Sequence, residues 1–309
     1  MTAAPLVPGP VTVRVPAKVN LELLVGPRRA DGYHSLATVY QAVGLYDDVT
    51  LAVADDFGVS VGGPLAAGVP TGDGNLALRA ARLLADRYDG EPVHVSIRKG
   101  IPVAGGMAGG SADAAATLVA LDHLWGLDLE RDEVEEVAAE LGSDVPFLVA
   151  GGTAMGGGRG ELLAPVLARG TYHWVLALSE RGLSTPEVYA ECDRLREGTE
   201  VPEPVATPAL MAALRSGDPH ELAPQLSNDL QDAAVSLRPD LGETLAAGME
   251  YGALGGIVSG SGPTCAFLVE GSEAGIDLAV ALTASGVASD VRRASGPVHG
   301  AHVIHHRVD

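Results

Sequence analysis

The sequence predicts an α+β protein of two domains. The chain has 309 residues, which is long enough for two domains that each bury a core. Strand-like alternation and helix-like spacing of apolar residues follow one another along the chain. The composition changes around residues 162–170. We therefore place a domain boundary there, between residues 1–165 and residues 166–309.

The composition is that of an acidic globular protein. Hydrophobic residues make up 47% of the chain, and no run of 18 apolar residues is uninterrupted, which argues against a membrane span. The first ten residues have neither the basic nor the apolar region of a signal peptide. Cys192 and Cys265 offer no disulfide framework and no zinc spacing, so we expect a cytoplasmic protein. A formal net charge of −20 argues against nucleic-acid binding.

The elements expected in the N-terminal domain begin with β-structure. Residues 11–25 alternate on both sides of Pro16, as one long strand or a strand pair. A turn at Asp47-Asp48 separates two further predicted strands, and Asp73 or Gly74 opens a helix. The predicted strands are residues 36–44, 48–53 and 93–99, the helices are 75–88, 111–125 and 129–141, and residues 151–161 form a strand with a hairpin turn.

The expected C-terminal domain alternates strands and helices around a Pro-rich, acidic loop at residues 198–208. The stretch from Gly255 to Val269 has the pattern of strand, glycine turn and strand. The other predicted elements are strands at 172–178 and 301–306 and helices at 185–195, 208–215, 219–235, 239–251 and 273–285.

Residues 100–118 form a glycine-punctuated loop that leads into a helix. Gly105, Gly106, Gly109 and Gly110 allow positive φ angles and a close approach of the backbone to a ligand. Ser111 is the expected N-cap. Unpaired amides at a helix N-terminus bind phosphate, but a tight turn before a packed helix explains the same pattern. The loop lacks the Gly-Lys-Ser/Thr of a Walker A motif and the spacing of a Rossmann fingerprint.

Several polar side chains are candidate site residues, although each also has an ordinary structural interpretation. Lys18 and Asn20 share one strand face, which either points into a site or is exposed. Lys18 and Lys99 draw notice because every other basic residue is arginine, but the ordinary interpretation of Lys99 is a surface lysine. Asp144 lies between a helix end and an apolar run, as a turn former or a site group.

Tyr33 and His34 end a turn-rich loop at residues 26–35. Their rings have the chemistry to stack on a planar ligand and hydrogen-bond to it. The ordinary interpretation is a half-buried tyrosine and a surface histidine, and the local sequence does not decide between the two.

Three stretches, taken in order, resemble the three motifs of the GHMP kinases, which include galactokinase and the homoserine, mevalonate and phosphomevalonate kinases. They are Pro16–Leu21, Pro102–Ala116 and Gly260–Thr264, and together they span nearly the whole chain. Further stretches resemble a branch of this family whose acceptor carries cytidine diphosphate: residues 29–34, 75–84 and 142–147. Ala104 and Ala108 depart from the usual glycines of that branch, and Asp113 stands where asparagine is common.

The resemblance implies the GHMP kinase fold, with an N-terminal domain like domain 2 of ribosomal protein S5 and an α+β C-terminal domain. It also implies ATP as donor, Mg²⁺ as metal and phosphorylation of the 2-hydroxyl of a methylerythritol unit in the non-mevalonate route to isoprenoid precursors. Asp144 would then be the general base, and Lys18 would keep it ionised and stabilise the developing alkoxide. Tyr33, His34 and Tyr189 would contact the cytidine, with Asn20 near the acceptor hydroxyl.

On the donor side the resemblance implies backbone contacts to the ATP phosphates, a contact of Asn75 with adenine or its ribose, and Ser111 as the Mg²⁺ ligand. The implied phosphate-binding residues are Pro102, Val103, Ala104, Gly105, Gly106, Met107, Ala108, Gly109, Gly110, Ser111 and Ala112.

Two other functions stay open from the sequence alone. One is a related kinase of homoserine or mevalonate type, although Tyr33 and His34 suit a nucleotide-linked acceptor better than a small acid. The other is a nucleotide-binding sensor without catalysis, which would be expected to lack Lys18 or Asp144. The sequence does not distinguish a monomer from a homodimer.

Overall fold

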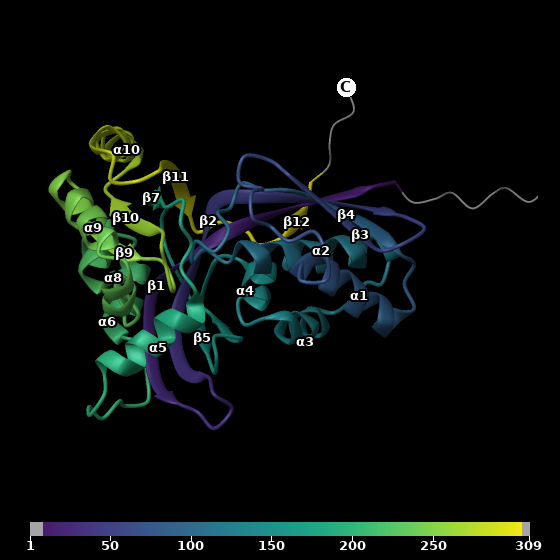
Figure 1. The fold of residues 1–309 in the computed structure, drawn as a ribbon, viewed down its shortest axis with the longest axis horizontal. Helices are drawn as coiled ribbons and strands as arrows, with labels where there is room; N and C mark the ends of the chain where they lie inside the picture. Colours follow the sequence, from purple (N-terminus) through teal and green to yellow (C-terminus); the bar gives the residue numbers. More distant parts are fainter. Residues whose placement is uncertain (1–8, 305–309) are drawn as a thin grey trace, which may run out of the picture.

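The longest elements of the fold are two antiparallel strands that form one hairpin (Figure 1). The structure is a computed structural model that describes residues 9–304, so residues 305–306 of the last predicted strand lie outside the described part. β1 (Val11–Arg28) is one continuous strand, and the turn-rich loop expected near residue 30 joins it to β2 (His34–Val53). The hairpin forms the centre of a sheet in which the order is β12-β1-β2-β4-β3.

The predicted turn at Asp47-Asp48 is wrong, because β2 runs through it without a break. The side chain of Asp47 is fully buried and accepts hydrogen bonds from the backbone N–H groups of Gly100 and Ile101. A register shift next to Pro16 absorbs the irregularity instead. β12 and β8 pair with β1 only at other positions, so the missing N–H of Pro16 interrupts neither of those two ladders.

Four helices cover one face of this sheet (Figure 1). They are α1 (Leu76–Tyr88), α2 (Gly109–Trp125), α3 (Arg131–Leu141) and α4 (Val145–Ala150). α2 is rich in alanine and buried on almost every side, which is typical of a helix packed between a sheet and other helices. Three of these helices were predicted, and the short α4 was not. The remaining strands of the sheet are β3 (Gly58–Gly62), β4 (Val93–Arg98), β5 (Thr153–Gly157), β6 (Leu162–Pro165), β8 (Ser227–Asn228) and β12 (His302–Val303).

The second half of the chain builds a sheet of order β11-β7-β10-β9. Its strands are β7 (Tyr172–Leu178), β9 (Gly255–Val258), β10 (Cys265–Val269) and β11 (Asp290–Gly296), of which only β11 was not predicted. Its helices are α5 (Thr185–Leu195), α6 (Pro208–Ser216), α7 (Pro219–Leu222), α8 (Gln231–Leu237), α9 (Asp240–Glu250) and α10 (Ser272–Ser285).

The single helix predicted over residues 219–235 is wrong. The segment contains α7, a 3-10 turn at Ala223–Gln225, the short strand β8 and then α8. Pro224 lies in the 3-10 turn, and proline inside a helix removes a hydrogen bond and clashes with the preceding turn. The break lets β8 pair in parallel with β1 at Glu22, so the second half of the chain extends the first sheet.

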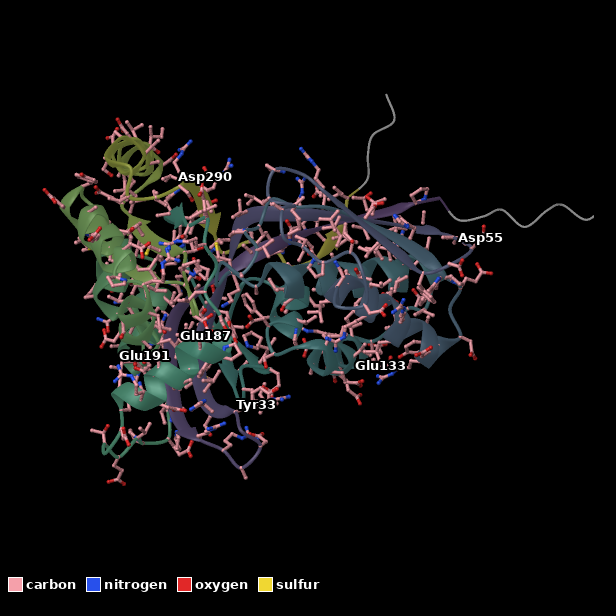
Figure 2. The ribbon with its side chains drawn as sticks, in the orientation of Figure 1. Tyr33, Asp55, Glu133, Glu187, Glu191 and Asp290 are labelled. Atoms are coloured by element: carbon pink, nitrogen blue, oxygen red, sulfur yellow. The ribbon has the colours of Figure 1, made fainter. Side chains whose placement is uncertain are left out.

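The termini of the described chain also meet in the first sheet, where β12 pairs with β1 at Val13 and Arg14. The division into residues 1–165 and 166–309 stays a prediction. Acidic side chains such as Asp55, Glu133 and Glu187 lie on the outside of the molecule (Figure 2). Within residues 9–304, no helix has the length and apolar character needed to cross a membrane.

Lys99 is not a surface lysine, because only 1% of it is exposed. Its Nζ donates to Asp47 Oδ2 at 2.5 Å, to Asp113 Oδ2 at 2.9 Å and to the carbonyl oxygen of Gly109 at 3.2 Å. This Lys99 cluster (Lys99, Asp47 and Asp113) joins the residue after β4 to β2 and to the first turns of α2. The loop between β4 and α2 is therefore held at both ends by one buried ammonium group.

The Lys99 cluster contains two buried carboxylates and one cation. Burial raises the pKa of Asp113 to about 8, and the charge of Lys99 opposes this shift only in part. Within the described chain, Asp113 Oδ1 has no hydrogen-bond partner. Asp113 therefore holds its proton to much higher pH than an exposed aspartate does, which keeps the cluster close to electrical neutrality.

The raised pKa of Asp113 has a measurable effect on stability. An unfolded chain ionises Asp113 at ordinary acidic pH, so the native state binds more protons than the unfolded state between about pH 4 and 8. The contribution of Asp113 to stability is therefore full below this range and is lost as pH rises towards 8. Asp113→Asn should reduce the fall in unfolding free energy between pH 5 and pH 8 by on the order of a few kcal/mol.

Urea unfolding at both pH values measures this difference, and Asp86→Asn, which changes an exposed aspartate of α1, is the control. If Asp113→Asn and wild type lost stability in parallel between the two pH values, Asp113 would not hold the extra proton.

Candidate active site

The loop between β4 and α2 ends in a helix N-terminus that no side chain caps. α2 begins at Gly109 with Ala108 as its N-cap, so the expected N-cap at Ser111 is wrong. By contrast, the side chain of Asn75 caps α1 by accepting from Ala77 N and Leu78 N. The first amides of any helix have no acceptor within that helix. In α2 they remain available to an anion.

Two alanines in this loop adopt backbone conformations that favour glycine. Ala104 has a φ of 49° and Ala108 a φ of 61°, both in the left-handed region. These are the two positions at which the sequence departs from the usual glycines. A non-glycine residue there costs roughly 1 kcal/mol or more, and the loop keeps the conformation nevertheless. The surrounding contacts must therefore determine its shape.

Those contacts come from both halves of the chain. Lys18 N donates to the carbonyl oxygen of Met107 at 3.4 Å, and Thr264 N donates to that of Gly105 at 3.3 Å. Ser259 Oγ donates to the carbonyl oxygen of Gly106 at 3.1 Å. Gly106 has a φ of 74°, and a Cβ on it would lie 2.0 Å from the carbonyl oxygen of Ser259. The turn between β9 and β10 thus packs directly against the loop.

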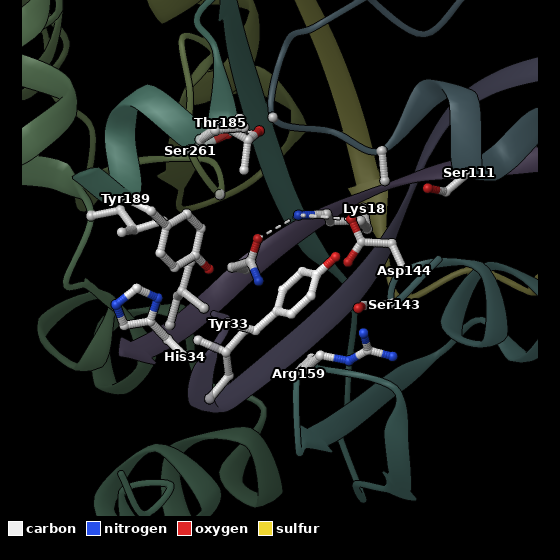
Figure 3. A pocket seen from close by; sticks show the side chains of 18 of the residues that line it. Lys18, Tyr33, His34, Ser111, Ser143, Asp144, Arg159, Thr185, Tyr189 and Ser261 are labelled. Atoms are coloured by element: carbon white, nitrogen blue, oxygen red, sulfur yellow. Dashed lines mark hydrogen bonds and ion pairs between the residues drawn. The ribbon is translucent and has the colours of Figure 1, made fainter. Parts of the chain in front are cut away.

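A pocket of about 670 Å³ opens beside this loop (Figure 3). It brings together most of the residues that the sequence singled out. The predicted residues that line it are Lys18, Asn20, Tyr33, His34, Ala104, Gly105, Gly106, Ala108, Gly109, Gly110, Ser111, Asp144 and Tyr189.

Five predicted residues do not line the pocket: Asn75, Pro102, Val103, Met107 and Ala112. Met107 and Ala112 belong to the hydrophobic core. The side-chain amide of Asn75 has structural partners, because its Oδ1 caps α1 and its Nδ2 donates a hydrogen bond to the carbonyl oxygen of Pro70 at 2.8 Å. The side chain of Asn75 therefore orders the start of α1, and its neighbour Leu76 reaches the pocket instead.

Lys18 and Asp144 lie next to each other in the pocket (Figure 3). Lys18 Nζ lies 3.9 Å from Asp144 Oδ2, and the side chains are 6% and 30% exposed. Burial lowers the pKa of Lys18, and the charge of Asp144 opposes that shift. Asp144 stands at the start of α4 but makes no capping hydrogen bond, so its carboxylate is free to face the pocket.

A chain of hydrogen bonds fixes the orientation of Lys18. Its Nζ donates to Asn20 Oδ1 at 2.6 Å, and Asn20 Nδ2 donates to Thr38 Oγ1 at 2.8 Å. Thr38 Oγ1 in turn donates to the carbonyl oxygen of Glu22 at 2.6 Å. A Cβ on Gly260 would lie 3.1 Å from Lys18 Nζ, so the turn of the second half closes over the lysine.

Tyr40 is a pocket residue that the sequence analysis missed. Its ring stacks on Phe147 at 4.9 Å between centroids and lies 5.7 Å from Lys18 Nζ. Burial, with a further contribution from the charge of Asp144, raises the pKa of the Tyr40 hydroxyl well above its ordinary value. No alternation marked Tyr40, because residues 37–43 of β2 are all buried.

Aromatic rings gather at the other end of the pocket. His34 and Tyr189 stack with centroids 5.1 Å apart, and Nε2 of His34 lies 2.8 Å from Asp193 Oδ1. The guanidinium of Arg159 lies 4.9 Å from the ring centroid of Tyr33. His34 is buried and Tyr33 is exposed, the reverse of the ordinary interpretation.

Two arginines and one aspartate of this pocket were also missed: Arg28, Arg159 and Asp193. Asp193 follows Tyr189 at helical spacing, which was the available signal, whereas the turn that carries Arg159 gave none. With Lys18, these arginines outnumber Asp144 and Asp193 in the lining of the cavity, which gives it a small excess of positive charge in an otherwise acidic chain. Such a cavity attracts anionic ligands.

Comparison with known proteins defines the family. Residues 75–152 match the model of the GHMP kinases N terminal domain, and residues 210–288 match that of the GHMP kinases C terminal domain. The chain therefore belongs to the GHMP kinase family, as its three motifs predicted, and it has the fold and the ATP-dependent kinase class of that family.

Within the family, the chain is similar to enzymes of one kind. It is 59% identical over 300 residues to the 4-diphosphocytidyl-2-C-methyl-D-erythritol kinase of Nocardia farcinica, covering 97% of this chain and 98% of the relative. A crystal structure of 4-(cytidine 5'-diphospho)-2C-methyl-D-erythritol kinase superposes with a TM-score of 0.73 at 33% identity, covering 92% of this chain and 98% of that one.

The fold is also shared with a mevalonate kinase from L. major in complex with R-mevalonate. That structure has a TM-score of 0.74 at 18% identity and covers 94% of this chain and 97% of that one. An identity this low shows a common fold and carries no information on the acceptor.

The contact between Gly106 and Ser259 predicts the effect of a small substitution. Gly106→Ala combines a strained φ with a clash against backbone, so it should lower the free energy of unfolding by roughly 2–4 kcal/mol. Gly110→Ala is the matched control: a Cβ there meets nothing within 4 Å, and alanine favours the helix. Urea unfolding of the two variants measures the difference, and equal stability would mean that the loop is not held by the second half of the chain.

Proposed function

We propose that this protein transfers the γ-phosphoryl group of ATP to the 2-hydroxyl of 4-diphosphocytidyl-2-C-methyl-D-erythritol, a step towards isoprenoid precursors. The observation that carries the proposal is the content of one pocket. It combines an open helix N-terminus, the Lys18–Asp144 pair and the ring of Tyr189 beside that of His34. These groups match a phosphate donor, an acceptor hydroxyl and a nucleobase.

The donor end of the pocket would be the loop from Ala104 to Ser111. Its backbone N–H groups and the positive end of the α2 dipole would bind the ATP phosphates. Phosphoryl transfer depends mainly on position and on stabilising charge, so a loop already held in shape is suited to it. The contact of Asn75 with adenine or ribose that the sequence suggested would have to come from its backbone, since its side chain caps α1.

At the reacting end, Asp144 would accept the proton of the acceptor hydroxyl as its oxygen bonds to the γ-phosphorus. The bond from that phosphorus to the β-phosphate oxygen breaks, and ADP carries the electron pair away. Lys18 would stabilise the alkoxide that develops on the acceptor, and Asn20 would hold the Lys18 ammonium in place.

Mg²⁺ fits this pocket with few protein ligands. Among residues 9–304, no three His, Cys, Asp or Glu side chains cluster as a metal site. Mg²⁺ usually keeps several waters and binds one or two protein oxygens together with substrate phosphates. The hydroxyl of Ser111 and the carboxylate of Asp144 line the pocket and offer oxygen donors of that kind. When bound, the ion would neutralise charge on the transferred group.

At the aromatic end of the pocket, the rings of Tyr33 and Tyr189 would stack on cytosine, and His34 would lie at the edge of the cytosine ring. The rings of His34 and Tyr189 are too close to admit a base between them, so the base would stack on the part of the Tyr189 face that His34 leaves uncovered, edge to edge with His34. Stacking on aromatic side chains is worth about 1–3 kcal/mol per base. Arg159, which Figure 3 shows beneath Ser143, would add positive charge for the diphosphate.

Variants of the reacting pair test the mechanism. Asp144→Asn removes the base and Lys18→Ala removes the cation, and each should lower kcat by at least about 10²-fold while the protein folds normally. Steady-state assays with Mg-ATP measure kcat, circular dichroism checks the fold, and Asp86→Asn controls for loss of a carboxylate. A variant with near wild-type turnover would remove its residue from the mechanism.

The acceptor is tested by ADP release with 4-diphosphocytidyl-2-C-methyl-D-erythritol beside homoserine, mevalonate and galactose. Turnover with the cytidyl compound alone is the expected result. Turnover with another of these acceptors would keep the kinase and reject the nucleobase site. ATP binding without turnover on any of them would favour a sensor.

A further inference from the structure

The aromatic end of the pocket, where cytosine is proposed to bind, contains a carboxylate that no step of the phosphoryl transfer uses. Asp193 Oδ1 lies 2.8 Å from Nε2 of His34, and the His34 side chain is only 7% exposed. Asp193 and Tyr189 are one helical turn apart on α5, so the helix presents a ring to one face of His34 and a carboxylate to its edge.

This contact determines which nitrogen of His34 carries the proton. An ionised carboxylate can only accept a hydrogen bond, so Nε2 must donate. In a neutral imidazole the other nitrogen, Nδ1, then has a free lone pair and acts as an acceptor. Among the described residues, Nδ1 of His34 takes part in no hydrogen bond. The ring therefore offers the pocket one unused acceptor.

We propose that Asp193 is a positioning residue that fixes the tautomer of His34 and thereby selects cytosine over uracil. The inference rests on the proposed function, because it concerns the base of the same acceptor. Cytosine presents an amino donor at C4, whereas uracil presents a carbonyl acceptor at the same place. An amino group matches the lone pair of Nδ1, and a carbonyl oxygen is repelled by it.

Asp193→Asn changes this arrangement with little change in shape. The carboxamide can donate a hydrogen bond to Nε2, which moves the proton to Nδ1 and turns the pocket-facing acceptor into a donor. An aspartate-to-asparagine change beside a catalytic histidine is known to act through the wrong tautomer. The ratio of the affinities for cytosine and uracil should fall at least about tenfold in this variant, because a hydrogen bond to the cytosine amino group is replaced by a repulsion.

Binding of the simple nucleotides CDP and UDP gives the first readout. Calorimetry on the full chain measures both Kd values for wild type, Asp193→Asn and Asp193→Ala. Glu187→Gln is the matched control, because it removes the charge of an exposed glutamate on the same helix (Figure 2). We expect wild type and Glu187→Gln to prefer CDP and both Asp193 variants to lose that preference.

¹⁵N NMR of the His34 ring measures its tautomer independently. The variant His34→Gln assigns the His34 signal, because that signal is absent from its spectrum. Protonation on Nε2 in wild type and on Nδ1 in Asp193→Asn supports the proposal. Protonation on Nδ1 in wild type overturns it, as does an unchanged ratio of CDP to UDP affinity in both Asp193 variants. An equal loss of affinity for both nucleotides also overturns it, because Asp193 would then only shape the pocket.

With the methylerythritol acceptor, a positioning role should raise KM in Asp193→Asn and leave kcat within about threefold of wild type. Failure of the proposed function would look different. Wild type would then phosphorylate no cytidyl acceptor, while the preference for CDP and the NMR result in the Asp193 variants would still decide the role of Asp193.

Discussion

The loop between β4 and α2 keeps its shape because one buried ammonium group holds its two ends. Lys99 joins Asp47 of β2 to Asp113 of α2, so the strand that enters the loop and the helix that leaves it move together. A site that acts through backbone amides needs those amides in place before the charge develops, because reorganisation during the reaction would raise the barrier. This restraint, together with the contacts from Lys18, Ser259 and Thr264, holds two alanines of the loop at left-handed φ angles.

The β1–β2 hairpin places the two ends of the pocket on one rigid element. β1 carries Lys18 and Asn20, and β2 begins with His34 and contains Tyr40. The second half of the chain adds the parts that complete the pocket, namely the turn at Gly260 and the helix α5. Groups on paired strands are held more accurately than groups on loops, which suits residues that must act on one atom of a ligand.

The sequence predicted the elements that depend on local pattern, and it missed those that depend on distant partners. Alternation and glycine turns located β1, β7, β9 and β10. The continuity of β2 was not predictable, because Asp47 resembles a turn residue until its buried partners are known. Pro224 is a helix breaker that the sequence shows, but the helical spacing of apolar residues in 219–235 was given more weight in predicting one helix there. Lys18 and Asp144 were recognisable through family motifs, whereas Asp193 is linked to the pocket by its contact with His34, which lies far away in the sequence.

The hairpin also has a consequence for inhibitor design. If the cytosine and the acceptor hydroxyl are bound at opposite ends of the β1–β2 hairpin, the diphosphate that links them must match a fixed distance, because paired strands resist stretching and bending. A cytidine compound with one phosphate fewer or more would keep its stacking on Tyr189 but would present its hydroxyl out of register with Asp144. Such a compound would occupy the pocket without accepting phosphate and so would block the enzyme as a competitive, unreactive analogue.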